Sequence, residues 1–292
     1  MPFRTQSGSP NRIAARFAQL KAENRGALIS FLEAYDPDPK TSMALLSGMP
    51  GAGADLIEIG MPFTDPMADG PIVQGAGQRA LKAGATMVGT LAMVRDFRKH
   101  DSETPIVLMG YFNPILSYGC DRFATDAASS GVDGLIVVDL PAEEAEELTK
   151  YTAKEGLELI RLVAPTTNDA RLPHVLRGSG GFVYFVSITG ITGTRTASAE
   201  ALAFHVPRIR KATDLPIAVG FGVRTPEQAA NAVRIADAAV VASALIDTLR
   251  QNLDEQGRAK PGAVRAVLDQ VRALSEAVRA ARCGADAGSR VA

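Results

Sequence analysis

Two carboxylates beside one apolar run are the residues of this chain best suited to chemistry. Glu58 lies near the end of the run 54–59, and Asp69 follows eleven residues later in a loop rich in proline and glycine. A strand buried on both faces is normally apolar throughout, so a carboxylate near its end requires an explanation. Two carboxylates in different surroundings can divide the work of proton transfer and charge stabilisation.

Side-chain alternation indicates where Glu58 points. Leu56 and Gly60 share its face of the expected strand, and the intervening isoleucines share the other face, which suits packing against helices. We therefore expect Glu58 to point into the mouth of a barrel. The simpler alternatives are that Glu58 only pairs with a lysine or arginine, and that Asp69 only caps a helix, because Asp, Gly and Pro favour turns.

The elements that must position these residues follow from a repeated pattern of apolar and amphipathic stretches. Eight βα units in about 230 residues predict an α/β protein, a single (β/α)₈ TIM barrel, with its active site at the C-terminal ends of the strands. A doubly wound open sheet is the alternative, but no GxGxxG motif follows any apolar run. The predicted strands are 27–32, 55–60, 105–111, 133–140, 157–163, 181–187, 216–222 and 238–243.

The chain is predicted to form one domain, since no internal linker separates the βα units. An extra helix over 11–23 precedes the first strand, and a long helix over 262–282 follows the last. We expect a flexible N-terminus over 1–11, a barrel domain with its flanking helices over 12–281, and a disordered tail over 282–292.

Composition excludes several classes of function. The 292 residues are 46% hydrophobic, and 31 Lys+Arg against 32 Asp+Glu give a net charge of −1, so neither a nucleic acid nor a membrane surface is an expected partner. No apolar run is long enough for a membrane span, and no secretory signal is visible. Two cysteines without a CxxC motif and three histidines away from strand ends predict no disulfide framework and no metal site. The cytoplasm is the expected location.

Three clusters of small residues provide a second chemical signal. The cluster 190–193 follows the sixth predicted strand, 220–222 ends the seventh, and 242–245 joins the eighth to the start of a helix. Backbone N–H groups after the last strands of such a barrel, together with a helix N-terminus, commonly bind a phosphate group. The alternative is that these residues only make tight turns.

Several segments resemble one known family closely. The segments are LIEIGMPFTDPMADGP, PIVLMGYFNPILSYG, GLIVVDLP, GFVYFVSITGITG and AVGFGVRTPEQ, and they are similar to the tryptophan synthase alpha chain family over about 12–247. The resemblance implies a lyase that cleaves indole-3-glycerol phosphate into indole and glyceraldehyde 3-phosphate. It also implies a beta-chain partner in an alpha2beta2 heterotetramer. The beta chain would hold pyridoxal phosphate, and this chain would hold no cofactor.

The resemblance also implies roles for individual residues. Glu58 matches the family's general acid/base, and Asp69 matches the carboxylate that holds the indole N–H. Phe31 matches a wall of the indole pocket, and Tyr184 matches a tyrosine near the catalytic Glu. Thr192 matches the threonine that meets the catalytic Asp when its loop closes.

The remaining matches concern the phosphate and the partner. Gly193, Gly222 and Ser243 match residues that bind the substrate phosphate. Asp65 and Asn113 match positions in the loops that face the beta chain.

Three residues depart from the family pattern: Glu33 stands for a threonine, Tyr35 for a glycine and Ala242 for a glycine in the phosphate turn. Glu33 shares a strand face with Phe31, so we expect a third carboxylate near Glu58, with one of that pair titrating at raised pH. The alternative is that Glu33 turns away to meet a cation or water. We expect the Ala242 methyl group to crowd the phosphate.

These departures leave three interpretations open. The first is an active alpha chain that performs the retro-aldol cleavage together with a beta chain. The second is the same lyase acting alone and releasing indole. The third is a weakly active homologue that mainly binds and activates the beta chain.

Overall fold

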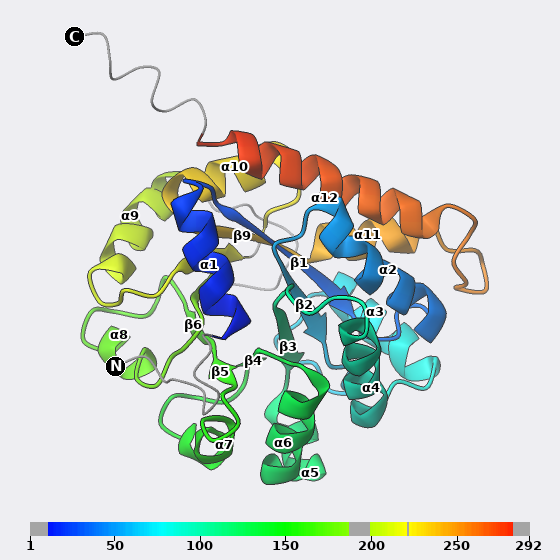
Figure 1. Ribbon diagram of the computed structural model, residues 1–292, viewed down its shortest axis with the longest axis horizontal. Helices are drawn as coiled ribbons and strands as arrows, with labels where there is room; N and C mark the ends of the chain where they lie inside the picture. The colour runs from blue at the N-terminus through cyan, green and yellow to red at the C-terminus, as the bar shows by residue number, and fades with distance from the viewer. Residues whose placement is uncertain (1–10, 187–198, 221, 283–292) are drawn as a thin grey trace, which may run out of the picture.

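The computed structural model of the chain describes residues 11–186, 199–220 and 222–282 (Figure 1). The strands are β1 (Ala27–Glu33), β2 (Leu56–Gly60), β3 (Ile106–Gly110), β4 (Gly134–Val137), β5 (Glu158–Leu159), β6 (Arg161–Val163), β7 (Val183–Val186), β8 (Ile217–Gly220) and β9 (Ala238–Val241). The helices are α1 (Arg12–Ala22), α2 (Pro39–Ala52), α3 (Pro71–Lys82), α4 (Met87–Arg98), α5 (Phe112–Tyr118), α6 (Cys120–Ser130), α7 (Glu146–Thr152), α8 (Leu172–Val175), α9 (Ala199–Arg210), α10 (Pro226–Ile235), α11 (Ser243–Gln251) and α12 (Ala263–Ala280).

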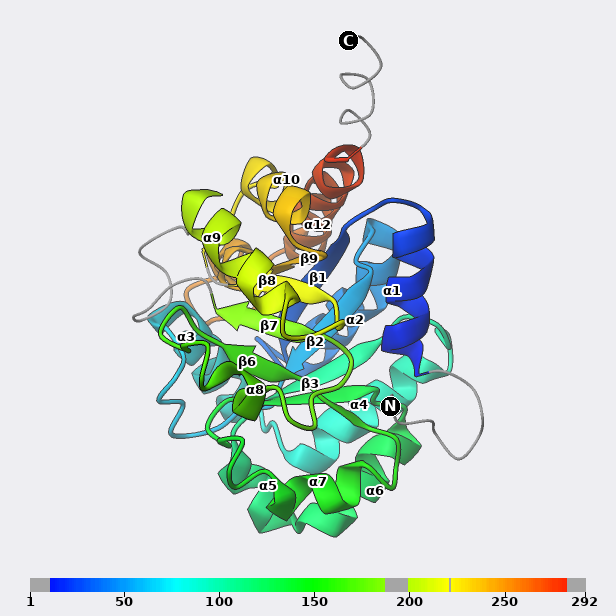
Figure 2. The ribbon, with the colours of Figure 1, turned by 90° about the vertical axis from the view of Figure 1, so that its left-hand side faces the viewer.

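All strand pairs in the sheet are parallel, in the order β5-β4-β3-β2-β1-β9-β8-β7-β6. Helices surround this sheet on its outside, as a TIM barrel requires (Figures 1 and 2). The predicted fold is therefore confirmed, and every predicted apolar run contains strand residues.

The predicted strand 157–163 is the one that the structure divides. β5 pairs with β4 and β6 pairs with β7, and a single residue, Ile160, separates the two short strands. The Ile160 N–H donates to the Leu135 carbonyl oxygen at 2.9 Å, so the chain stays bonded to β4 through this point. The first half of this stretch pairs with β4 and the second half pairs with β7, so the stretch joins the two ends of the sheet and closes the ring.

Apolar side chains fill two layers. The larger layer lies between the strands and the outer helices, and the smaller one fills the inside of the barrel. Helix α1 covers the floor, the end at which the strands begin, and places Ile13, Phe17 and Leu20 in the inner layer. The rings of Phe17 and Phe182 lie with their centroids 5.9 Å apart. The predicted helix before the barrel is thus the element that closes the floor of the barrel.

Helix α12 is the predicted long helix after the barrel, and it packs against α2, α10 and α11. The predicted terminal segments 1–11 and 282–292 fall almost entirely outside the described residues, so the proposed division of the chain stays a prediction. None of the described helices is both long and apolar enough to cross a membrane.

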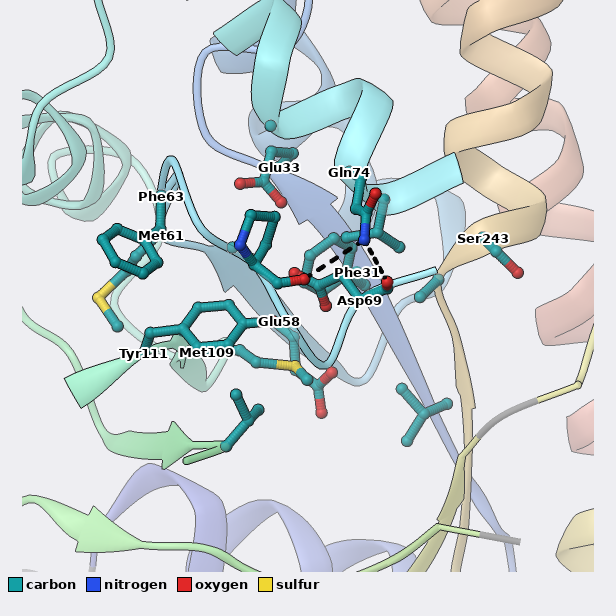
Figure 3. Close-up of a pocket in the computed structure, with 18 of the residues that line it drawn as sticks. Phe31, Glu33, Glu58, Met61, Phe63, Asp69, Gln74, Met109, Tyr111 and Ser243 are labelled. Atoms are coloured by element: carbon teal, nitrogen blue, oxygen red, sulfur yellow. Dashed lines mark hydrogen bonds between the residues drawn. The ribbon is translucent and has the colours of Figure 1, made fainter. Parts of the chain in front are cut away.

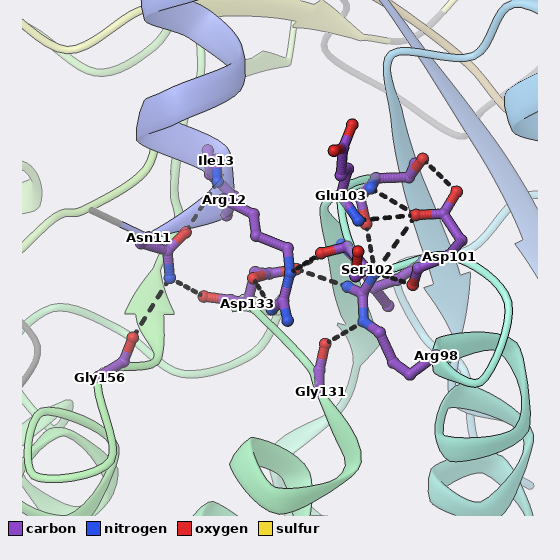
Figure 4. Close-up of polar contacts among 12 residues, drawn as sticks. Asn11, Arg12, Ile13, Arg98, Asp101, Ser102, Glu103, Gly131, Asp133 and Gly156 are labelled. Atoms are coloured by element: carbon purple, nitrogen blue, oxygen red, sulfur yellow. Dashed lines mark hydrogen bonds and ion pairs between the residues drawn. The ribbon is translucent and has the colours of Figure 1, made fainter. Parts of the chain in front are cut away.

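A buried aspartate at the floor holds two strands in register. Asp133, directly before β4, accepts 2.8 Å hydrogen bonds from Arg12, from Arg98 and from the Ile106 N–H, and its own N–H donates to the Ile106 carbonyl oxygen at 2.8 Å (Figure 4). The carboxylate therefore ties the first residue of β3 to the start of β4 and binds two arginines. Asn11 also donates to the Asp133 carbonyl oxygen at 2.9 Å, which anchors the start of α1.

The same arrangement occurs before two other strands. In each, an aspartate binds an arginine at 2.9 Å, accepts a 2.9 Å hydrogen bond from an amide of the preceding strand and donates its N–H to that residue's carbonyl oxygen at 2.8 Å. The groups are Asp55 with Arg25 and Leu28 before β2, and Asp237 with Arg210 and Ile217 before β9. We call Asp55, Asp133 and Asp237 with their arginines the floor clamps.

Removing the most buried floor clamp should destabilise the fold strongly. In Asp133→Ala, Arg98 and the Ile106 N–H lose a buried partner, so we expect the free energy of unfolding to fall by about 3 kcal/mol or more. The matched control is Asp237→Ala, whose carboxylate and arginine side chains are 26% and 48% exposed, against 3% and 10% for Asp133 and Arg98. Its loss should be about 1 kcal/mol. Urea unfolding measures both, and equal losses would contradict the assignment.

Candidate active site

A cavity opens at the C-terminal ends of the strands, opposite the floor. It encloses about 890 Å³ of space, including its open mouth, and all three predicted carboxylates line it: Glu33, Glu58 and Asp69 (Figure 3). Phe31, Tyr184, Gly222, Ala242 and Ser243 line the same cavity. The structure therefore brings together every predicted site residue except Thr192 and Gly193, which lie outside the described residues.

Glu58 is the most deeply buried of these groups. It lies in β2 with no exposed surface, and neither of its carboxylate oxygens has a hydrogen-bond partner in the described part of the chain. Burial raises the pKa of Glu58 to about 8, because the surrounding apolar walls disfavour its charged form. Within the described residues no cation pairs with Glu58, and a pKa of about 8 lets the side chain hold or release a proton near neutral pH.

Tyr184 approaches the cavity from β7. Burial, and next the negative charge of Glu58, raise the pKa of the Tyr184 hydroxyl well above its usual value. A Cβ atom at Gly220 would lie 2.2 Å from the Tyr184 hydroxyl oxygen, so the glycine on β8 makes room for this ring. Tyr184 therefore stays protonated beside Glu58 and can donate a hydrogen bond.

Asp69 lies in the loop between β2 and α3, and its carboxylate does not cap that helix. The N-cap of α3 is Gly70, which makes no side-chain capping bond, so the simpler alternative for Asp69 fails. Gln74 donates to the Asp69 carbonyl oxygen at 2.8 Å and fixes the backbone of the loop. Burial raises the pKa of Asp69, and a hydrogen bond from the Tyr111 hydroxyl acts in the opposite direction.

Tyr111 is a site residue that our reading of the sequence missed. It follows β3, is 3% exposed, and its hydroxyl oxygen accepts a 2.9 Å hydrogen bond from the Ala68 N–H. Its ring lies 5.5 Å from that of Phe63, centroid to centroid. Tyr111 thus holds the loop that carries Asp69. A tyrosine at the end of the run 105–111, beside the strand of Glu58, was the available signal.

Ser243 marks the end of the cavity where a phosphate is expected. It is the first residue of α11, next to Ala242, and Gly222 lies nearby with a φ of +85° that favours glycine. Arg224 is a second residue that the sequence reading missed. Its guanidinium lies 3.5 Å from the Ser243 hydroxyl and 3.3 Å from the Asp247 carboxylate. This end of the cavity therefore combines a helix N-terminus with a nearby positive charge.

Glu33 points into the cavity, as predicted, and brings a third carboxyl group there (Figure 3). Burial, followed by the charges of Asp69 and Asp36, raises its pKa well above the usual value, whereas burial alone raises that of Glu58. The expected coupling between Glu33 and Glu58 stays a prediction. Tyr35 adopts a φ of +70° beside Glu33.

The described residues do not meet the requirements of a metal site. Among residues 11–186, 199–220 and 222–282, no group of three or more His, Cys, Asp or Glu side chains could hold a metal ion. Acid–base chemistry by carboxylates is what the described arrangement supports.

The fold and this site define a (β/α)₈-barrel enzyme that works by acid–base chemistry on a substrate with an apolar part and an anionic part. Comparison with known proteins identifies which one. A family described as tryptophan synthase alpha chain matches residues 17–278, and the chain belongs to this family. The resemblance found in the sequence is confirmed. The chain is a lyase of tryptophan biosynthesis that cleaves indole-3-glycerol phosphate into indole and glyceraldehyde 3-phosphate.

Individual relatives agree with this assignment. The tryptophan synthase alpha chain of Granulibacter bethesdensis is 67% identical over 275 residues, which cover 94% of this chain and 99% of the relative. That of Acidiphilium cryptum is 66% identical over 272 residues, covering 93% and 99%. Among solved structures, tryptophan synthase subunit alpha from Legionella pneumophila str. Paris superposes with a TM-score of 0.85 at 37% identity, covering 92% of this chain and 99% of that one.

The buried Glu58 carboxyl should make stability depend on pH. Between its unfolded pKa of 4.5 and its folded value of about 8, only the folded chain keeps the proton, so stability falls as pH rises. Glu58→Gln lacks this proton. We expect the free energy of unfolding of the variant, relative to that of wild type, to increase by about 2–3 kcal/mol as the pH rises from roughly 5.5 to 7.5.

Unfolding by urea at a series of pH values measures this difference. Asp96→Asn is the control, because Asp96 is an exposed carboxylate on α4 and its lowered pKa keeps it ionised throughout this range. A Glu58→Gln gap that stays constant with pH would show that Glu58 ionises normally in the folded chain.

Proposed function

We propose that Glu58 is the general acid/base of the retro-aldol cleavage and that Asp69 holds the indole N–H. The observation that carries the proposal is the Glu58 carboxyl: it is fully buried, lines the cavity and has no hydrogen-bond partner in the described chain. A buried polar group without a partner is costly, and proteins retain such groups mainly where they function.

Two proton transfers are needed, and one carboxyl group can perform both. The ring carbon that is leaving the side chain must gain a proton, and a hydroxyl of the glycerol chain must lose one as the carbonyl forms. With a pKa of about 8, Glu58 holds its proton near neutral pH and can donate it, and the resulting carboxylate can then accept the hydroxyl proton. Such acid–base help typically contributes about 10²- to 10⁴-fold in rate.

Asp69 and Tyr111 would act on the ring nitrogen. Protonation of the ring carbon places positive charge on the ring, and an ionised Asp69 at the N–H stabilises that charge. The hydrogen bond from Tyr111 favours the ionised form of Asp69, against the effect of burial. Two carboxyl groups in one cavity thus take different roles because their hydrogen bonds differ.

The phosphate would bind at the other end of the cavity. The backbone of Gly222, the hydroxyl of Ser243 and the N-terminus of α11 lie there, and Gly193 is proposed to join them. Phe31 would form a wall for the ring, and Thr192 would meet the catalytic Asp. The Arg224 guanidinium beside Ser243 adds a favourable charge.

The tryptophan synthase alpha family functions with a beta chain, and we propose that this chain assembles with one as an alpha2beta2 heterotetramer. Asp65 and Asn113 lie in the loop after β2 and in α5, which are the segments expected to face the partner. Two large apolar side chains are exposed in the same segments, Met67 at 82% and Leu116 at 49%. Pyridoxal phosphate would belong to the beta chain. A cytoplasmic location stays a prediction.

Removing either proposed catalytic carboxylate should abolish turnover. We expect Glu58→Gln and Asp69→Asn each to lower indole release from indole-3-glycerol phosphate by at least about 10²-fold, because proton transfer or charge stabilisation is lost. Indole release is measured with and without a beta chain, which also separates the paired lyase from one that acts alone. Asp96→Asn is the matched control.

A folded Glu58→Gln protein with near-normal turnover would refute the role of Glu58. Turnover that is negligible in wild type, with normal activation of a beta chain, would favour the weakly active homologue instead.

The Ala242 methyl group is the subject of a separate prediction about the phosphate. Ala242 lines the cavity directly before Ser243, so its methyl group limits how closely an anion can approach the backbone. Ala242→Gly should tighten the binding of glycerol 3-phosphate several-fold and leave the binding of indole unchanged. Isothermal titration with both ligands tests this, and unchanged glycerol 3-phosphate affinity would show that the methyl group is harmless.

A further inference from the structure

Arg224 is a cation beside the active-site cavity that its neighbours hold only loosely. It follows β8, and its guanidinium lies 3.5 Å from the Ser243 hydroxyl oxygen and 3.3 Å from the Asp247 carboxylate. Charge-assisted hydrogen bonds of arginine are normally about 2.7–2.9 Å long, so both contacts are weak. The Arg224 side chain is 37% exposed, and its guanidinium keeps donors for a further partner.

Asp247 does not depend on Arg224 for its pairing. Arg250, on the same helix α11, donates two hydrogen bonds to the Asp247 carboxylate at 2.8 and 3.0 Å, and Gln251 donates another at 3.1 Å. Asp247 would therefore keep its tighter partners if Arg224 turned away. Movement of the guanidinium from Asp247 to an anion leaves neither charge unpaired, so the movement carries little energetic cost.

The backbone of Arg224 is fixed although its side chain is loosely held. The Arg224 N–H donates to the Gln228 side-chain oxygen at 2.8 Å, and Thr225 and Gln228 form a capping box at the start of α10. This anchoring keeps the guanidinium close to Ser243. It also reduces the loss of conformational freedom when the side chain binds a ligand.

The Ser243 hydroxyl group retains its own proton for a ligand. An arginine only donates hydrogen bonds, so Ser243 is the acceptor in its contact with Arg224. Ser243 lines the cavity at the first position of α11 (Figure 3), and Ala242 before it makes no side-chain capping bond. A phosphate oxygen that accepts the hydroxyl proton would lie about 2.7 Å from Ser243, within reach of the guanidinium after a small side-chain movement.

We propose that Arg224 is a substrate-binding residue whose guanidinium moves from Asp247 to the phosphate group of indole-3-glycerol phosphate. The proposal rests on the phosphate end of the cavity proposed above and adds a direct ion pair to it. Asp247 then competes with the phosphate for Arg224. The phosphate wins this competition because a guanidinium and a phosphate pair bidentately, whereas the contact with Asp247 is single and long.

Isothermal titration of glycerol 3-phosphate into the full-length chain measures this ion pair. Arg224→Gln should weaken binding about tenfold, and Arg224→Lys should recover part of the loss, because it restores the charge without the bidentate geometry. Arg250→Gln is the matched control: it removes the other arginine from Asp247 and should change the affinity by about twofold or less. Indole has no phosphate group and should bind to all four proteins equally.

Asp247→Asn separates a binding role of Arg224 from a structural one. If Asp247 competes for Arg224, this variant should bind glycerol 3-phosphate several-fold more tightly, and the gain should disappear when Arg224→Gln is added. If the ion pair only holds the loop before α10 against α11, Asp247→Asn should weaken binding or leave it unchanged. Either of these results would overturn the proposal.

Ser243→Ala distinguishes failure of this proposal from failure of the proposed phosphate end. Weaker binding of glycerol 3-phosphate in Ser243→Ala, with unchanged binding in Arg224→Gln, would remove the role of Arg224 alone. Unchanged binding in both variants would place the phosphate elsewhere and remove both assignments. Indole release from indole-3-glycerol phosphate by the same wild-type sample reports the lyase chemistry separately.

Discussion

Strand register at the floor of the barrel is the constraint on which the active site depends. In each floor clamp, an aspartate exchanges two hydrogen bonds with one residue of the preceding strand and binds an arginine. A shift of one residue would turn every side chain of a strand to the other face. Because the Asp55 clamp fixes the register of β2, Glu58 further along that strand faces the inside of the barrel, where its charge acts on Tyr184 of β7.

The two ends of the barrel treat buried polar groups in opposite ways. At the floor, Asp133 is surrounded by donors, and its burial is offset by three hydrogen bonds. At the mouth, Glu58 is fully buried, and its carboxylate oxygens have no such partners among the described residues. The unsatisfied Glu58 carboxyl group thus lies where a ligand can reach it, and the well-paired floor and the two apolar layers offset its energetic cost.

The features that could be predicted from the sequence are those that depend on residues close together in the chain. Alternation along a strand is a property of the backbone, so the inward position of Glu58 and the barrel itself followed from sequence. The role of Tyr111 did not, because it depends on a contact with Ala68, which is 43 residues away. The coupling of Glu33 to Asp69 depends on where a loop folds back. The floor clamps do have a sequence pattern: an apolar residue is followed by an aspartate directly before or near the start of the strand, as at Asp55, Asp133 and Asp237.

Ile160, where the chain passes from pairing with β4 to pairing with β7, divides the sequence of the barrel into two halves that contribute different residues to the cavity. The half before it contributes Phe31 and the three carboxyl groups to the cavity, and the half after it contributes Tyr184 and Ser243. The floor spans the break, because Phe17 of the first half packs against Phe182 of the second. Two fragments separated at this point would need each other for a closed core. Exchange of the second half between relatives would alter the proposed phosphate end of the cavity while leaving Glu58 and Asp69 in place.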